Sequence, residues 1–320
     1  MNRKMFGVAV LGVMLASFSG LFCKMAMNDG NDSLQVLFWR FAFSAIILLP
    51  VNLIGKIIER KHVIKGQEVF YEKRSNLNRK RIGAVMLVAG LLFGIHFSFF
   101  YLSFQYVSTL LATILVGLQV IFSALYESIF FKFHIKMRAY IGVTVAFTGV
   151  LVTVLENIGN KEEHSSLIGI LFAILAAMIG PLYMSCTRYL GKSAPEISTG
   201  MYMNVLMIFG AGTVILIESI RGQNVFNISM YGLGMGLLLA VVCQCLGVSL
   251  QNWSLKYIST IDLNTAVLSE SIFLALWNFI LFSQIPSLYT VVGGTMICLG
   301  IWYFIKSETG MQSVHDNYNP

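Results

Sequence analysis

Long apolar segments alternate with short polar ones along the whole chain. Ten of them approach or exceed the ~20 residues that a helix needs to cross the hydrocarbon core of a bilayer. They are residues 5–27, 34–55, 82–103, 108–131, 137–156, 167–187, 197–218, 230–252, 260–282 and 287–305. These runs are too continuous for the alternating strands of ~10 residues that build a membrane β-barrel. The pattern therefore predicts an all-α membrane protein with ten transmembrane helices.

The second half of the chain repeats the first. A shift of 151 residues sets Tyr106–Leu151 over Tyr257–Trp302 without a gap, and 13 of the 46 positions are identical. About three matches are expected by chance from so biased a composition. The matches begin with Tyr-x-Ser-Thr in both copies and include Gly142 with Gly293 and Gly149 with Gly300. We infer an internal duplication, which is a stronger signal than a short motif.

Five predicted spans lie on each side of residues 157–166. Because five is odd, a first unit that starts in the cytoplasm ends outside, and the second unit then runs in the opposite direction. Inverted repeats of this kind build many secondary transporters, whose substrate site lies near the middle of the membrane between the halves. The predicted organisation is a first five-helix repeat over residues 1–156, a second over 167–306 and a cytoplasmic tail over 307–320.

The composition agrees with a membrane location and the charges set an orientation. Hydrophobic residues make up 57% of the chain and charged residues 12%. With both termini inside, eighteen Lys and Arg lie on the inner side, nine of them in residues 56–81, against Lys161 and Arg221 outside. The positive-inside rule then predicts an N-in, C-in protein of the cell inner (cytoplasmic) membrane. This asymmetry explains the net charge of +7 without any nucleic-acid partner.

Polar side chains inside the spans mark the candidate site. Glu270 lies almost at the centre of the ninth span, and the repeat pairs it with Gln119 at the centre of the fourth. Symmetry places both groups near the axis that relates the halves, although Glu270 also fits a structural role, bonded to Arg40 or to an amide. Arg40 stays charged and therefore needs a partner inside the bundle. His96 fits either packing or a functional role.

Aromatic side chains beside these groups suggest a pocket for a small amphipathic solute. The candidates are Phe97, Phe100, Tyr101, Trp253 and Trp277. No clustered pair of Lys or Arg residues near the centre could hold a phosphate bidentately. No metal-ligand spacing and no catalytic motif is present, so the sequence predicts neither a cofactor nor an enzyme.

The chain resembles the EamA type of the drug/metabolite transporter superfamily. The resemblance covers residues 5–305 and rests on the ten spans in two halves, on Trp39-Arg40-Phe41 at the second span, and on Gly142-x6-Gly149 repeated as Gly293-x6-Gly300. The family usually has an acidic residue nine positions before the first of these glycines, where this chain has Phe133 and Gln284.

The resemblance implies a central cavity lined by the third, fourth, eighth and ninth spans. It places His96, Gln119, Gln244 and Glu270 around that cavity and Arg40 at its flank. Such proteins export amino acids, metabolites or drugs, so the expected partners are a small-molecule substrate and membrane lipids. The resemblance leaves open whether transport is coupled to protons and whether the protein forms a homodimer. A membrane scaffold or sensor, or an intramembrane enzyme acting on lipid, are the alternative functions.

Overall fold

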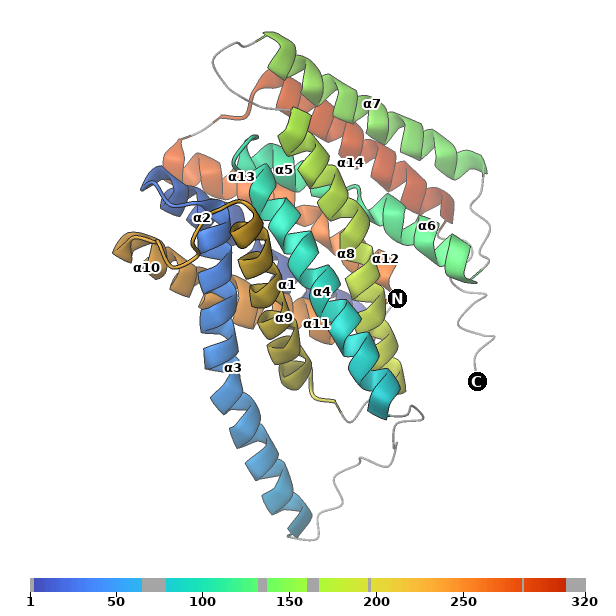
Figure 1. The fold of residues 1–320 in the computed structure, drawn as a ribbon. Helices are drawn as coiled ribbons and strands as arrows, with labels where there is room; N and C mark the ends of the chain where they lie inside the picture. The colour runs from blue at the N-terminus through green and yellow to red at the C-terminus, as the bar shows by residue number, and fades with distance from the viewer. Residues whose placement is uncertain are drawn as a thin grey trace.

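The computed structural model describes residues 3–64, 79–131, 137–159, 167–194, 197–283 and 285–308. Every regular element in these ranges is a helix (Figure 1). The first half contains α1 (Arg3–Ala16), α2 (Phe18–Asn28), α3 (Ser33–Ile64), α4 (Arg79–Ser103), α5 (Thr109–Val116), α6 (Gln119–Phe131) and α7 (Met137–Gly159). The second contains α8 (Leu167–Ser193), α9 (Thr199–Ile220), α10 (Met230–Leu238), the π-helix η1 (Leu239–Val248), α11 (Ser249–Ser254), α12 (Thr260–Val267), α13 (Ser269–Phe282) and α14 (Leu288–Glu308).

Each of the ten predicted spans coincides with one helix or with consecutive helices. By length and composition, eight of the described segments are candidate membrane spans, and two shorter apolar helices occupy Tyr140–Val152 and Leu288–Phe304. One predicted boundary differs from the structure: the second span was predicted to end at residue 55, whereas α3 continues as a helix to Ile64, into the basic segment 56–81. The middle of that segment, residues 65–78, lies outside the described residues.

Serine caps start the fourth and ninth predicted spans in the same way. The side chain of Ser108 accepts a hydrogen bond from the backbone N–H of Leu111, and that of Ser259 accepts one from Asp262. Ser108 and Ser259 are the serines of the repeated Tyr-x-Ser-Thr motif. A serine oxygen satisfies one of the backbone N–H groups that a helix leaves open at its start, so this motif fixes where both helices begin.

Both of these helices are also interrupted at equivalent positions. α5 ends before Gly117, α12 ends before Leu268, and the shift of 151 residues relates the two interruptions. They lie against each other, since a Cβ added to Gly117 would be 2.9 Å from Cδ2 of Leu268. The first span is interrupted as well, at Ser17 between α1 and α2.

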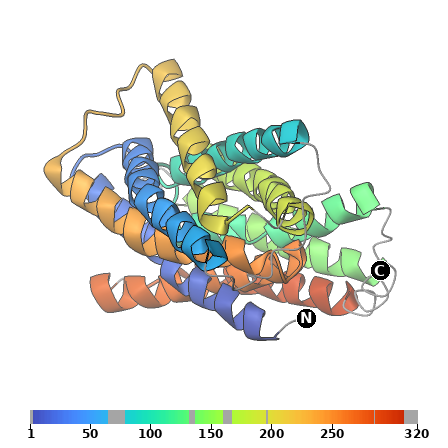
Figure 2. The same ribbon diagram turned by 90° about the horizontal axis from the view of Figure 1, so that it is seen from below.

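Helices α7 and α14 pack side by side at one edge of the molecule, and the view from below shows α14 along the margin of the bundle (Figures 1 and 2). A Cβ on Gly142 would meet the carbonyl oxygen of Gly300 at 2.5 Å, and one on Gly149 would meet that of Gly293 at 2.6 Å. The helices therefore run antiparallel. Each glycine of one helix faces the non-equivalent glycine of the other, as a two-fold relation requires.

We expect Gly300→Ala to weaken this helix pair. Its Cβ would lie 2.5 Å from the backbone nitrogen of Ala146 and 2.6 Å from the carbonyl oxygen of Gly142, so the helices must separate. Overpacking of this kind costs about 1–3 kcal/mol. The expected result is a lower apparent melting temperature of the detergent-solubilised protein. Gly212→Ala is the matched control, because the space around Gly212 is open. Equal melting temperatures for the two variants would contradict the packing.

Candidate functional site

A small cavity with polar and apolar lining residues lies where the two halves meet. Its volume is about 40 Å³, and its lining includes Arg40, His96, Gln119 and Glu270. One water molecule needs about 10–15 Å³ of such space, so the cavity has room for about three. Four of the six predicted site residues therefore surround one space, although they come from four different helices, α3, α4, α6 and α13.

Residues related by the 151-residue shift line this cavity in pairs. The pairs are Phe97 with Val248, Phe100 with Gln251, Val116 with Val267, and Gln119 with Glu270. The first two pairs come from α4 and from the segment η1 to α11. The other two flank the interruptions of the fourth and ninth spans. Equivalent positions of the two halves thus line the same cavity.

Arg40 is almost fully buried, with 1% of its surface exposed. Its Nε donates to Oε1 of Gln244 at 2.9 Å, and its Nη1 donates to the hydroxyls of Ser19 at 2.9 Å and Tyr101 at 2.7 Å. The guanidinium also lies over the ring of Phe97, 4.9 Å from its centroid. These hydroxyl, amide and ring contacts replace the water that a cation would otherwise require. They also fix the direction of the guanidinium, which faces the cavity.

Gln244 contributes to the site through Arg40. It is fully buried in η1, it does not line the cavity, and its Nε2 has no hydrogen-bond partner in the described part of the chain. The expectation that Gln244 surrounds the cavity thus changes to a role in positioning the guanidinium.

His96 on α4 is bonded to the backbone of α8. Its Nδ1 lies 2.9 Å from the carbonyl oxygen of Ala176 on α8. Because a carbonyl only accepts hydrogen bonds, Nδ1 is the donor, and Nε2 of the neutral ring is left as an acceptor. Gly180 allows this close approach, since a Cβ there would lie 3.0 Å from the imidazole and 2.8 Å from Oε1 of Gln119.

Glu270 and Gln119 retain free acceptors beside the cavity. No described residue donates a hydrogen bond to the Glu270 carboxyl group or forms an ion pair with it, and Oε1 of buried Gln119 also has no described partner. Arg40 and Glu270 therefore share a cavity without pairing with each other. The bond between Glu270 and Arg40 that a purely structural role would use does not form in this conformation.

Only some of the candidate aromatic residues reach the cavity. Phe97 and Phe100 line it, while Tyr101 lies behind and bonds Arg40. Trp277 points elsewhere: its Nε1 donates to Ser17 at 3.0 Å and its ring stacks on Phe18 with centroids 4.6 Å apart. Trp253 is 38% exposed. The structure thus places Trp277 at the interruption between α1 and α2, outside the candidate site.

Among the lining residues that were not anticipated from the sequence, Ser19 and Tyr183 contact the predicted site residues. Ser19 on α2 bonds both Arg40 and Tyr101, and Tyr183 on α8 faces His96 with ring centroids 5.6 Å apart. Serine is common at packing positions of membrane helices, so its identity carries little information. The proximity of Tyr183 to Gly180-Pro181 is the one signal that marks this part of α8.

A polar network closes the end of the bundle at which α3 begins and α9 ends. Arg221 pairs with Asp32 at 3.1 Å and with Glu218, and Nε2 of Gln105 donates to Asp32 at 2.9 Å and to Ser33 at 2.8 Å. Partial burial lowers the pKa of Arg221, but the bonds and charges of Asp32 and Glu218 outweigh it and raise that pKa. The network joins three places: the start of α3, the turn after α4 and the end of α9.

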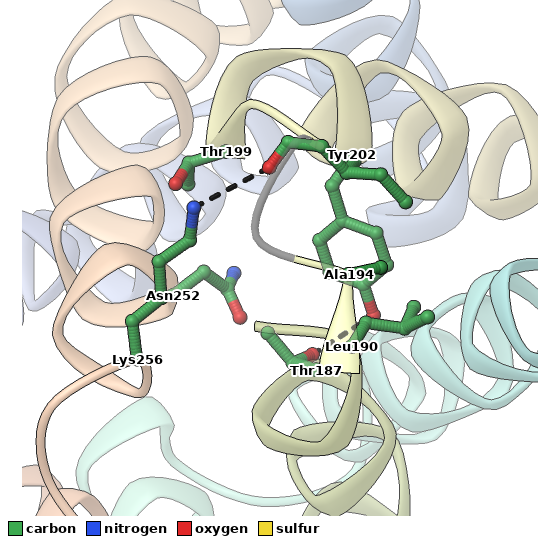
Figure 3. Close-up of a pocket in the computed structure, with 8 residues that line it drawn as sticks. Thr187, Leu190, Ala194, Thr199, Tyr202, Asn252 and Lys256 are labelled. Carbon is green, nitrogen blue, oxygen red and sulfur yellow. Dashed lines mark hydrogen bonds between the residues drawn. The ribbon is translucent and has the colours of Figure 1, made fainter. Parts of the chain in front are cut away.

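A crevice of about 20 Å³ lies at the opposite end, between the end of α8, the start of α9 and α11 (Figure 3). Nζ of Lys256 donates to the carbonyl oxygen of Ile197 at 3.4 Å, and the hydroxyls of Thr187 and Tyr202 lie 2.9 Å apart across it (Figure 3). Burial lowers the pKa of Lys256. Asn252 lines this crevice and its neighbour Gln251 lines the central cavity, so α11 separates the two.

Several apolar helices long enough to cross a bilayer, packed around a small central cavity, define a multi-pass membrane protein. The model of the EamA-like transporter family matches residues 4–155 and again residues 167–306, so the chain belongs to this family and is a membrane transporter.

Two curated relatives agree with this assignment. An uncharacterized transporter of Clostridium kluyveri is 23% identical over 283 residues, covering 86% of this chain and 84% of its own. The uncharacterized transporter YyaM of Bacillus subtilis is 22% identical over 268 residues, covering 82% and 81%. A protein of known crystal structure matches with a TM-score of 0.61 over 94% of this chain and 97% of its own, at 13% identity, which shows the fold alone.

We expect Tyr101→Phe to destabilise the protein. The change keeps the ring against Arg40 and removes the hydroxyl that accepts from Nη1, and a lost bond to a buried charge costs about 1–3 kcal/mol. Tyr106→Phe is the control, since no hydrogen bond of the Tyr106 hydroxyl occurs within the described residues. Thermal denaturation in detergent measures both. A Tyr101→Phe protein as stable as the control would show that Ser19 and Gln244 suffice for Arg40.

Proposed function

We propose that the protein is a secondary transporter that exports small organic solutes across the cytoplasmic membrane by alternating access. The observation that carries this proposal is the central cavity, lined by four pairs of equivalent residues from the two halves. A site shared by related halves can face either side of the membrane when one half rocks against the other. The cavity of about 40 Å³ then belongs to a narrow conformation that widens when substrate enters.

The proposed halves are inverted five-helix repeats, residues 1–156 and 167–306. Three features support this relation: the facing glycines of α7 and α14, the contact between the two helix interruptions, and the paired cavity lining. Ten crossings follow if α7 and α14 also span. The apolar core Tyr140–Val152 is short for a bilayer, but α7 as a whole extends over 23 residues.

We further propose that Glu270 couples transport to protons. Dehydration disfavours an ionised carboxyl, so a carboxyl without a partner can exchange a proton as the cavity opens to either side. The other charged or titratable groups around the cavity are Arg40 on α3, His96 on α4 and Tyr183 on α8. Gln119 is the counterpart of Glu270 that hydrogen-bonds without titrating. Proton entry would then return Glu270 to its starting state after each export step.

Glu270→Gln tests this coupling, because it keeps the size and hydrogen bonding of the side chain and removes its ionisation. In proteoliposomes, we expect substrate exchange at equal pH to persist and accumulation driven by a pH gradient to be lost. Asp262→Asn removes a carboxylate from the capping box of α12, away from the cavity, and should keep the gradient dependence. Gradient-driven accumulation by Glu270→Gln at the parental level would make Glu270 a structural residue.

Orientation is tested by cysteine labelling. With both termini in the cytoplasm, a cysteine at Ser75, which lies outside the described residues, should react with a membrane-impermeant thiol reagent only after the cells are permeabilised. A cysteine at Gln223, which is exposed in the turn after α9, should react in intact cells. The parent protein supplies the background, since its five cysteines are at least partly buried. The opposite labelling pattern would reverse the topology.

A further inference from the structure

The same turn follows the helices α4 and α11, one in each half of the chain. After α4, the hydroxyl of Ser103 donates to the carbonyl oxygen of Phe100 at 2.6 Å. After α11, the hydroxyl of Ser254 donates to the carbonyl oxygen of Gln251 at 2.7 Å. The shift of 151 residues relates both pairs. Phe100 and Gln251 line the central cavity, so both turns begin beside it.

The two turns lie at opposite ends of the bundle, and α9 measures the distance between these ends. The end of α9 is joined to the start of α3, because Arg221 pairs with Asp32. The first residue of α9, Thr199, lines the crevice together with Lys256. The 22 residues of α9, at 1.5 Å per residue, separate the two ends by about 33 Å. This is close to the ~30 Å thickness of the hydrocarbon core.

A buried apolar side chain separates the cavity from a polar residue in each turn. Phe104 is buried and packs against Phe100 with ring centroids 4.7 Å apart. Its equivalent in the second half, Leu255, is fully buried. The residues that follow are polar, Gln105 in one turn and Lys256 in the other. Both turns therefore have the same order: a residue that lines the cavity, a buried apolar residue and a polar residue.

Gln105 and Lys256 each bond the start of the second long helix of their own half. Nε2 of Gln105 donates to Asp32 at 2.9 Å and to Ser33, the first residue of α3, at 2.8 Å. Nζ of Lys256 donates to the carbonyl oxygen of Ile197, two residues before α9, at 3.4 Å (Figure 3). Equivalent side chains thus tie equivalent elements together at the two ends of the cavity.

The two contacts differ in strength. Gln105 bonds a carboxylate, and Arg221 adds an ion pair to Asp32 at 3.1 Å and a bond to Oε1 of Gln105 at 3.3 Å. The single described bond of Lys256 is longer than an ordinary N–H···O bond, and its acceptor is an uncharged carbonyl. Bonds between charged partners are stronger. Of these two contacts, the one at Gln105 holds more firmly.

We propose that Gln105 and Lys256 hold two gates that close the cavity on opposite membrane faces and open in turn. The gate at Gln105, which Asp32 and Arg221 reinforce, is the firmer one, and the gate at Lys256 opens more readily. These gates rest on the proposed alternating access and add to it the side chains that keep each end closed. With both termini in the cytoplasm, the gate at Gln105 faces the outside.

Access to a cysteine in the cavity tests the two gates. Val116→Cys places a thiol in the cavity lining of the full-length protein. A small membrane-impermeant methanethiosulfonate is then applied to right-side-out and to inside-out membrane vesicles. Each gate variant is also made without Val116→Cys, and the labelling of its native cysteines is subtracted. The reaction of Gln223→Cys identifies the face of the Gln105 gate, because residue 223 follows α9 at that end.

We expect Gln105→Ala and, independently, Arg221→Gln to raise the labelling rate from the face of the Gln105 gate about fivefold or more, since each removes bonds to a charged partner. Lys256→Met should raise the rate from the opposite face at least about twofold, as loss of a weaker bond predicts. In each case labelling from the other face should not rise, because the open states share one protein population. Gln223→Ala and Lys4→Met change exposed residues of the same types and should alter neither rate.

A rise from both faces in the gate variants would show a general loosening of the bundle and overturn the proposal. Unchanged labelling from a variant's own face would overturn it as well. Uptake measurements in proteoliposomes keep the proposed function separate. One-sided changes in labelling without uptake of any solute would refute transport and leave the gates standing. Uptake by the parent, with labelling that Gln105→Ala, Arg221→Gln and Lys256→Met do not change, would refute the gates and leave transport standing.

Discussion

A guanidinium buried inside a membrane bundle needs polar partners, and Arg40 sets this requirement for several helices at once. Its guanidinium donates hydrogen bonds to Ser19 of α2, Tyr101 of α4 and Gln244 of η1. Two of these partners belong to the first half of the chain and one to the second. A charged side chain at the centre of a membrane helix costs at least about 2.5–3.5 kcal/mol, so the contacts of this cluster have to form together. The same cluster therefore joins the halves and presents one free edge of the cation to the cavity.

The helices around this cluster have the same local features at equivalent positions of the two halves. Equivalent serines cap α5 and α12, and equivalent positions interrupt both helices where they touch. The glycines of α7 and α14 let two backbones approach without intervening side chains. Such contacts gain close packing, which stabilises helix pairs in lipid where the hydrophobic effect offers little.

The sequence predicted the helical segments, their division into two related sets and four of the residues around the cavity. Hydropathy reveals which segments avoid water, and the internal repeat pointed to Glu270 and Gln119, equivalent positions that line the same cavity. Neither hydropathy nor the repeat could give the direction of each side chain within a uniformly apolar helix. Trp277 and Gln244 therefore take places outside the cavity lining, while Ser19 and Tyr183 enter the site without a distinctive local pattern. The extension of α3 to Ile64 was missed because charged residues in a helix look like a loop when hydropathy is the only guide.

The internal repeat constrains the residues between α7 and α14 more tightly than the residues that line the cavity. Gly142 faces Gly300 and Gly149 faces Gly293, so a bulkier residue in either copy disturbs both, and neither copy can diverge alone at these places. Gln119 and Glu270 face a space that is large enough for water and do not touch in this way. One copy could thus acquire an acid while the other kept an amide. An ancestor with identical halves would have had identical residues at equivalent positions of the cavity. The present chain keeps this identity at Val116 and Val267 and has lost it at Gln119 and Glu270.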